Sequence, residues 1–241
     1  MNIVKRLLII IYSILFFIPI VIITTIICGT ATIIMIPIFG DNKWGYYPGR
    51  VWARIICYTS FVRINTKGNE NIEHNKSYIF LANHQSIFDI FLIYGWLNSK
   101  FKWVMKKEIR NIPLVGKACD IMGHIFINRS SAIQAQKSLL LAEAKLKNGN
   151  SIVIFPEGTR TKDGKLGKFK KGAFHIARDL HLPIVPITIK GAFEVMPYNT
   201  FIINPGKIEM IIHKPINTDT LADNNIIEMI ENVKNIINKD L

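Results

Sequence analysis

Short apolar runs separated by helical patterns predict an α/β fold, with a mixed, largely parallel sheet flanked by helices. Strands that alternate with helical segments are typical of such sheets, and runs that are apolar throughout are typical of strands covered on both faces. A much longer uncharged stretch near the start of the chain predicts a separate N-terminal hydrophobic helix. The 241 residues are enough for one ordinary domain and such an appendage.

The first element along the chain is this hydrophobic segment. No charged residue occurs from Leu7 to Phe39, and this run exceeds the roughly 20 apolar residues that a helix needs to cross a bilayer. The hydrophobic part of a cleaved signal peptide is shorter, about 7–15 residues. No small residue directly precedes Cys28, so a lipoprotein cleavage site is also disfavoured. We therefore expect a helical membrane anchor.

Two arrangements of the anchor stay open. As one straight helix it would be about 50 Å long, against a hydrocarbon core of about 30 Å, and Pro19 and the Cys28-Gly29 step are candidate breaks. A single tilted span and a two-helix hairpin within one leaflet are both compatible with this length. Basic residues on both flanks mildly favour the hairpin, with both ends on the cytoplasmic side. They are Lys5, Arg6, Lys43, Arg50 and Arg54.

The turn-rich stretch Gly40–Gly45 predicts the boundary between the two parts of the chain. We expect residues 1–44 to form the anchor and residues 45–241 to form the α/β domain. Its predicted strands, of which the last has the weakest pattern, are Ser77–Leu81, Phe101–Met105, His124–Asn128, Ser151–Phe155, Ile184–Ile189 and Lys207–Ile212. Its predicted helices are Ile87–Leu97, Ser130–Asn148, Ala173–Leu180 and Ile226–Ile237.

Charge and cysteine content narrow the classes of partner. The formal net charge of +13 suits anionic lipid head groups and phosphorylated substrates. No nucleic acid is expected as a partner, because no recognition motif accompanies the lysines. The three cysteines are scattered without metal-ligand spacing, which indicates a reducing compartment and no disulfide framework.

A histidine and an aspartate interrupt the apolar stretch Leu81–Phe91. The segment Ser86–Asp89 predicts a helix start with Ser86 as its N-cap, which places His84 in the loop just before the helix. A carboxylate in the first helical turn leans back toward that loop. Asp89 would then hold one imidazole nitrogen and leave the other free to act as a base. From this stretch alone, a plain capping box beside an uninvolved histidine is an equal alternative.

Polar residues also follow the predicted strand Ser151–Phe155. A proline ends the strand, a glycine permits a tight turn, and Glu157 and Arg160 emerge at its carboxyl end, where ligands bind in open α/β sheets. The guanidinium fork of Arg160 suits a phosphate, because it can bind two oxygens at once. A structural ion pair between Glu157 and Arg160 is the alternative.

Three further stretches add to this pattern. Arg129 follows the predicted strand His124–Asn128, although taken alone it is more often a surface arginine. The lysines of Thr161–Gly172 form a basic loop that suits anionic head groups or a nucleotide phosphate, the alternative being a solvated surface. The segment Leu182–Ile187 carries two prolines and predicts an edge or bulged strand, or the wall of an apolar groove.

The segments Asn83–Asp89, Gly123–Arg129, Phe155–Arg160 and Leu182–Ile187 resemble, in this order, the four sequence blocks of glycerolipid acyltransferases. The similarity is strongest to the bacterial 1-acyl-sn-glycerol-3-phosphate acyltransferases and covers roughly residues 45–215. A His-x4-Asp pattern alone is weakly specific, but followed by Phe-Pro-Glu-Gly-Thr-Arg at this distance it is highly specific. The segment Val104–Pro113 also resembles the family's lysine-bearing segment between the first two blocks.

The resemblance implies a reaction and a role for each of these residues. His84 would act as general base on the sn-2 hydroxyl of lysophosphatidic acid, which attacks an acyl thioester, and Asp89 would orient His84. No convincing serine or cysteine nucleophile is present, so direct transfer is preferred to an acyl-enzyme. Further residues would hold the acceptor phosphate or shape its site: Lys106, Arg129, Glu157, Gly158, Thr159 and Arg160.

The implied product is phosphatidic acid, made in phospholipid biosynthesis by a domain on the cytoplasmic face of the cell membrane. Its partners would be the phospholipid bilayer, lysophosphatidic acid, and acyl-CoA or acyl carrier protein as co-substrate, with no cofactor and no metal. One alternative is the same chemistry on glycerol 3-phosphate or another lysophospholipid. An alternative of another class is a non-catalytic lipid-phosphate binder, which would need Arg160 and the anchor but neither His84 nor Asp89.

Overall fold

The computed structural model describes residues 3–40, 43–128, 150–218 and 225–241. Within them, seven strands form a sheet in the order β1-β7-β6-β2-β5-β3-β4. All neighbouring strands are parallel except β6 and β7, so the prediction of a mixed, largely parallel sheet is confirmed. The strands are β1 (Val62–Lys67), β2 (Ile79–Ala82), β3 (Lys100–Lys106), β4 (Ile125–Ile127), β5 (Asn150–Ile154), β6 (Ile184–Lys190) and β7 (Gly206–Ile212).

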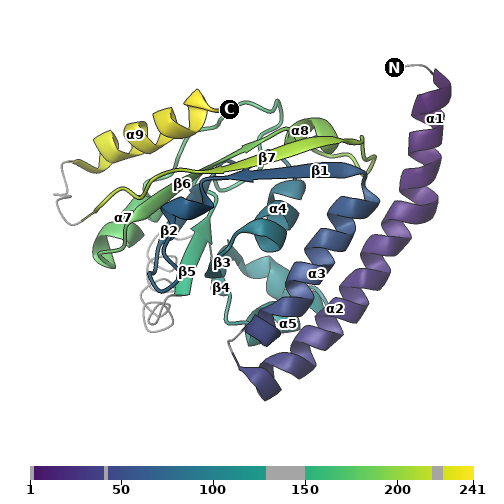
Figure 1. The fold of residues 1–241 in the computed structure, drawn as a ribbon, viewed down its shortest axis with the longest axis horizontal. Coiled ribbons are helices and arrows are strands. Elements are labelled where there is room, and N and C mark those ends of the chain that lie inside the picture. The colour runs from purple at the N-terminus through teal and green to yellow at the C-terminus, as the bar shows by residue number, and fades with distance from the viewer. Residues whose placement is uncertain (1–2, 41–42, 129–149, 219–224) are drawn as a thin grey trace.

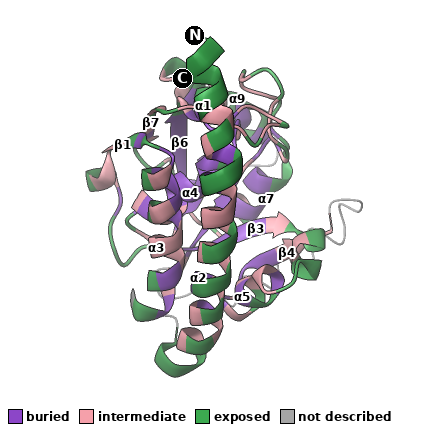
Figure 2. Ribbon diagram, turned by 90° about the vertical axis from the view of Figure 1, so that its right-hand side faces the viewer, coloured by how far each residue is buried: buried purple, intermediate pink, exposed green. Residues whose placement is uncertain are grey.

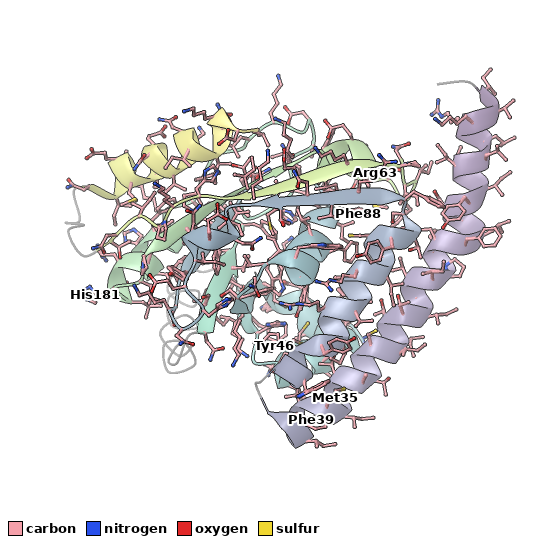
Figure 3. The ribbon with its side chains drawn as sticks, viewed as in Figure 1. Met35, Phe39, Tyr46, Arg63, Phe88 and His181 are labelled. Carbon is pink, nitrogen blue, oxygen red and sulfur yellow. The ribbon has the colours of Figure 1, made fainter. Side chains whose placement is uncertain are left out.

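The central strands bury both faces, as their continuous apolar sequences predict. In β2, Phe80 and Ala82 join one core cluster, whereas Ile79 and Leu81 join a second cluster on the opposite face. Helices α3 (Lys43–Thr59), α4 (Phe88–Trp96) and α8 (Ala192–Val195) cover the first face, and Phe88 of α4 is labelled in Figure 3. Helices α7 (Gly172–Asp179) and α9 (Ile226–Lys239) cover the second face (Figure 1).

Each predicted strand has an observed counterpart with slightly shifted ends, and the three predicted helices within the described residues are also present as α4, α7 and α9. The predicted helix Ser130–Asn148 lies outside the described residues, as does Arg129. The sequence pattern does not predict strand β1, helix α3 or the short helix α5 (Val115–Ile121).

One strand prediction is wrong in its place in the sheet. The segment Leu182–Ile187 is not an edge, because β6 lies between β2 and β7. Pro186 fits inside the sheet because the ladder with β7 begins only at the next residue, Ile187. The Pro186 carbonyl accepts a hydrogen bond from the His213 N–H at 3.0 Å. Pro186 has no N–H to donate, and it lies at the end of the ladder with β7, where the lack of a donor is tolerated.

The N-terminal segment is one continuous helix. It comprises α1 (Ile3–Tyr12), a π-helical turn (Ser13–Phe17) and α2 (Ile18–Phe39), and neither candidate break point interrupts it. Pro19 is tolerated because it lies at the start of α2, directly after the π-helical turn. Gly29 serves close packing instead of a break, since a Cβ there would lie 3.1 Å from the Leu114 side chain.

Figure 2 shows this helix exposed or partly exposed along most of its length, and many of its exposed side chains are large and apolar. It is long and apolar enough to cross a membrane, and only 11% of its most apolar 18-residue stretch is buried, unlike the core helix of a soluble domain. Figure 3 shows side chains along its outer side pointing away from the protein body, with Met35 and Phe39 near its C-terminal end. Such a surface suits contact with lipid.

Helix α3 returns alongside α2 and joins it to the sheet (Figure 1). The Trp52 indole N–H donates to the Thr25 hydroxyl at 3.0 Å. Arg50 and Arg54 donate to the carbonyls of Leu97 and Gly95, at the C-terminal end of α4, so these two anchor-flanking cations stabilise a helix end.

Candidate active site

The strand order brings the candidate residues to one edge of the sheet. Strands β2, β5 and β3 are parallel neighbours, so their carboxyl ends meet at the same edge. His84 follows β2, the segment Glu157–Arg160 follows β5, and Lys106 ends β3. Residues far apart in the sequence thus converge at the position where open α/β sheets bind ligands.

His84 and Asp89 are in direct contact. The His84 Nδ1 lies 2.8 Å from the Asp89 Oδ2, and the carboxylate is fully buried whereas the imidazole is 13% exposed. The ring stacks on Phe155, with ring centroids 3.8 Å apart. Within the described residues, the His84 Nε2 makes no hydrogen bond. A carboxylate on Nδ1 selects the tautomer that leaves Nε2 as a proton acceptor.

The Asp89 carboxylate is fixed by the start of its own helix. Its Oδ2 also accepts hydrogen bonds from the backbone N–H groups of Gln85 and Ser86, at 2.7 and 2.8 Å. The Ser86 hydroxyl accepts a hydrogen bond from the Phe88 N–H at 3.3 Å, but the N-cap of α4 is Ile87 and not the predicted Ser86, so the predicted capping box forms only in part. The same carboxylate therefore accepts backbone N–H groups at the helix start and contacts the histidine, so the alternative of an uninvolved histidine is wrong.

Asn83, which had no predicted role, fixes the loop that carries His84 to the sheet. The buried Asn83 side chain donates to the Ile189 carbonyl and accepts from the Ile189 N–H, at 2.8 and 2.7 Å. Such a paired amide holds the loop between β2 and α4 against β6. These two hydrogen bonds fix the position of the backbone next to His84 relative to β6.

Glu157 connects the histidine loop to the basic loop. Its carboxylate accepts from the His84 N–H at 2.7 Å and from the Gly167 N–H at 2.8 Å, and its side chain is buried. Burial raises the pKa of Glu157 to about 7, although the two N–H donors oppose that rise. No ion pair with Arg160 is formed within the described residues, so Glu157 holds two loops together instead.

Two cations face the same cavity without an acidic partner among the described residues. Lys106 and Arg160 both line it, as does the backbone of Gly158 and Thr159 between β5 and Arg160. Gly158 adopts a φ of +75°, and a Cβ there would lie 2.8 Å from the Lys170 ammonium nitrogen. The glycine thus permits both the turn and the approach of a lysine from the basic loop.

The cavity has a volume of about 510 Å³ and extends from His84 to the N-terminal helix. Its walls are mainly apolar and come from β3, α2, α3, α4 and the region of α5; they include Cys28, Trp52, Ile90, Val104, Ala118 and Met122. This volume lies within the range of about 300–1,000 Å³ that is typical of small-molecule sites. An imidazole, two cations without an acidic partner in the described part of the chain and a long apolar wall suit a ligand with a phosphate and an alkyl chain.

Sequence reasoning missed two aromatic residues at this site. Phe155 was placed at the end of a strand and at the start of the third family block without a role of its own, yet its ring stacks on His84. Tyr198 was given no role, yet its ring lies under the Arg160 guanidinium, 5.2 Å from the guanidinium carbon to the ring centroid. Phe155 begins the block Phe155–Arg160, which was the available signal, whereas the role of Tyr198 depends on a contact between distant segments of the chain.

Comparison with known proteins agrees with this geometry. The sequence model of the Acyltransferase family matches residues 63–190, which include the histidine, the aspartate and both cations described above. The chain belongs to the acyltransferase family. The prediction made from the four blocks is thereby confirmed at the level of the family.

Named relatives of this acyltransferase include plant and bacterial enzymes. A chloroplastic 1-acyl-sn-glycerol-3-phosphate acyltransferase of Arabidopsis thaliana is 38% identical over 73% of this chain, but the chain spans only 49% of that relative. A 1-acyl-sn-glycerol-3-phosphate acyltransferase of Pseudomonas aeruginosa is 31% identical over 76% of this chain and 72% of the relative. The chain thus spans about half the length of the chloroplastic relative and nearly three quarters of the bacterial one.

A solved structure has the same fold. The crystal structure of the 1-acyl-sn-glycerophosphate (LPA) acyltransferase PlsC from Thermotoga maritima superposes with a TM-score of 0.79 at 26% identity. The alignment covers 98% of this chain and 95% of that one. The likeness therefore includes the long N-terminal helix as well as the sheet.

Proposed function

We propose that this acyltransferase moves a fatty acyl group from an acyl thioester to the sn-2 hydroxyl of lysophosphatidic acid, producing phosphatidic acid. The observation that carries the proposal is the His84–Asp89 contact at 2.8 Å, beside a cavity lined by His84, Lys106 and Arg160, the two cations having no acidic partner among the described residues. A general base, a phosphate site and an apolar wall are the groups this reaction needs. The names of the relatives add independent support.

In the proposed mechanism, the His84 Nε2 takes the proton of the acceptor hydroxyl as that oxygen attacks the thioester carbonyl carbon. Asp89 stabilises the imidazolium that forms. The tetrahedral intermediate collapses with cleavage of the carbon–sulfur bond, and the departing sulfur takes the proton from the imidazolium. The products are the ester and a free thiol, and His84 returns to its neutral form without a covalent acyl-enzyme.

The remaining residues are proposed to bind and position the acceptor. Lys106 and Arg160, together with Arg129, would neutralise its phosphate. Gly158 and Thr159 would shape the turn that brings Arg160 to the cavity. Glu157 would act indirectly, since both of its carboxylate oxygens already accept backbone N–H groups.

The proposed acyl donor is acyl-CoA or acyl carrier protein, with no cofactor and no metal ion. Within the described residues, no three histidine, cysteine, aspartate or glutamate side chains gather as a metal site would need. Proton transfer by His84 and charge neutralisation by the cations account for the reaction without such a group.

We also propose a place in the cell. Residues 1–44 would anchor the protein in the cell membrane, and residues 45–241 would form the catalytic domain on the cytoplasmic face. The exposed apolar surface of α1 and α2 supports contact with the bilayer. The cavity walls contributed by Thr25, Cys28 and Thr32 of α2 support delivery of a lipid acceptor directly from that bilayer.

The proposal is tested by supplying the purified full chain, in mixed micelles, with a long-chain acyl-CoA and one acceptor at a time. The acceptors are lysophosphatidic acid, glycerol 3-phosphate and lysophosphatidylcholine, and acyl carrier protein replaces CoA in a parallel series. We expect phosphatidic acid from lysophosphatidic acid with at least one donor. Turnover of only another acceptor, or of none with either donor, would contradict the proposal.

A further inference from the structure

Arg160 raises a question of orientation, because an unpaired guanidinium on a long side chain is normally mobile. Within the described residues, it makes no ion pair and no side-chain hydrogen bond. The guanidinium lies over the ring of Tyr198, whose centroid is 5.2 Å from the guanidinium carbon. Both side chains line the cavity that contains His84.

Tyr198 lies on a segment that is fixed to the helix start carrying Asp89. The Met196 carbonyl accepts a hydrogen bond from the buried Ser86 hydroxyl at 2.8 Å. The Thr200 N–H donates to the Pro197 carbonyl at 3.4 Å, and Asn199 has a φ of +58°, so Tyr198 and Asn199 are the central residues of a tight turn. The ring is therefore tied through the backbone to the first turn of α4.

An aromatic ring differs from a carboxylate as a partner for this arginine. A carboxylate would orient the guanidinium but would also cancel its charge and compete with the phosphate for its N–H donors. The face of a tyrosine ring attracts the cation through its quadrupole and leaves those donors free. Arg160 can thus be held in place while it keeps its full charge for a ligand.

We propose that Tyr198 is a positioning residue that holds the Arg160 guanidinium ready for the acceptor phosphate. The proposal rests on the proposed function, in which Arg160 binds that phosphate. Tyr198 lies outside residues 63–190, so the family match does not include it. The hydrogen bond between the Ser86 hydroxyl and the Met196 carbonyl connects the segment of Tyr198 to the His84–Asp89 pair, and so links the position of Arg160 to that pair.

The test is a double-mutant cycle between Tyr198 and Arg160, with the KM for lysophosphatidic acid and kcat measured in mixed micelles. The variants are Tyr198→Leu, Tyr198→Phe, Arg160→Gln and Tyr198→Leu combined with Arg160→Gln. Phe201→Leu makes the same kind of change in the same segment, at a ring that is 76% exposed, and serves as the control. Circular dichroism and thermal unfolding establish that each variant is folded. Tyr198→Met is a second variant that lacks the ring, in case Tyr198→Leu does not fold.

We expect Tyr198→Leu to raise the KM about 5-fold, within a range of about 2- to 30-fold given by typical cation–π interactions, with little change in kcat. Tyr198→Phe keeps the ring face and should match the wild type, as should Phe201→Leu. In the Arg160→Gln background, Tyr198→Leu should have no further effect.

Three results would overturn the inference. If Tyr198→Phe raised the KM as much as Tyr198→Leu, the hydroxyl group and not the ring face would be the part of Tyr198 that matters. An equal loss in the Arg160→Gln background would mean that Tyr198 acts independently of the arginine. An unchanged KM in both Tyr198→Leu and Tyr198→Met would remove the role altogether. A wild-type protein without transferase activity would instead refute the proposed function.

Discussion

Replacing Asp89 with asparagine tests how the carboxylate assists His84. The change keeps the size of the side chain and one oxygen that can accept the Gln85 and Ser86 N–H groups, which lie 2.7 and 2.8 Å away. What it removes is the negative charge beside the His84 Nδ1, also at 2.8 Å. In the proposed mechanism, the imidazolium that forms on His84 then loses its counterion.

The size of the effect follows from that geometry. Two unit charges about 4 Å apart interact by about 4 kcal/mol at an effective dielectric constant of about 20, and about 1.4 kcal/mol corresponds to a tenfold change in rate. Allowing for partial compensation by the amide dipole, we expect kcat to fall about 10²- to 10³-fold. The KM for lysophosphatidic acid should change little, because Asp89 does not line the cavity.

The assay is steady-state phosphatidic acid formation by purified Asp89→Asn, His84→Ala and the double variant. Asp163→Asn, an exposed aspartate that accepts from the Lys165 N–H, is the matched control. If Asp89 acts through His84 as proposed, the double variant should be no slower than His84→Ala alone. A kcat for Asp89→Asn within about 3-fold of the wild type, or a fully additive loss in the double variant, would refute the reasoning.

Three further predictions concern the phosphate site, the buried glutamate and the anchor. Arg160→Gln removes charge-assisted hydrogen bonds and should raise the KM for lysophosphatidic acid about 10- to 100-fold, as measured by initial rates; an unchanged KM would exclude Arg160 from the phosphate site. Folding raises the pKa of Glu157 from 4.5 to about 7, so the native state holds that proton more tightly and stability should fall as pH rises from about 4.5 to 7. Glu157→Gln should flatten this slope in urea unfolding, and an equal slope in both proteins would contradict it. Replacing the exposed Ile23 and Ile27 by lysine should release the protein from phospholipid vesicles in a flotation assay, whereas retention equal to the wild type would argue against the anchor.

Local patterns predicted the central strands and helices because apolar runs and helix-start spacings involve only residues that are close in the sequence. Continuous apolar runs identified β2, β3, β5 and β6, and the serine-to-aspartate spacing located the start of α4. The same spacing predicted the contact between His84 and Asp89, since it depends only on the geometry of one helix start.

Other features depend on distant contacts that no local pattern contains. Strand β6 can lie inside the sheet because its ladder with β7 begins at Ile187, one residue after Pro186. The proline predicted an edge strand, but it lies at the end of that ladder, where no N–H is needed. Helix α3 carries glycine and proline and lies in the core only because α2 and α4 pack against it. The Arg160–Tyr198 contact joins segments on either side of β6 in the sequence, so nothing near Arg160 could have predicted it.

The central claim is that His84 is the base of an acyl transfer to lysophosphatidic acid, and that the protein is more than a binder of that lipid. The most direct measurement is phosphatidic acid formation by the wild type and His84→Ala, with lysophosphatidic acid binding measured on the same samples. The account predicts that the wild type forms phosphatidic acid, that the variant loses at least about 10²-fold in rate, and that both bind the lipid equally. Equal rates for the two proteins would contradict the role of His84, and binding without turnover by the wild type would contradict the claim of catalysis.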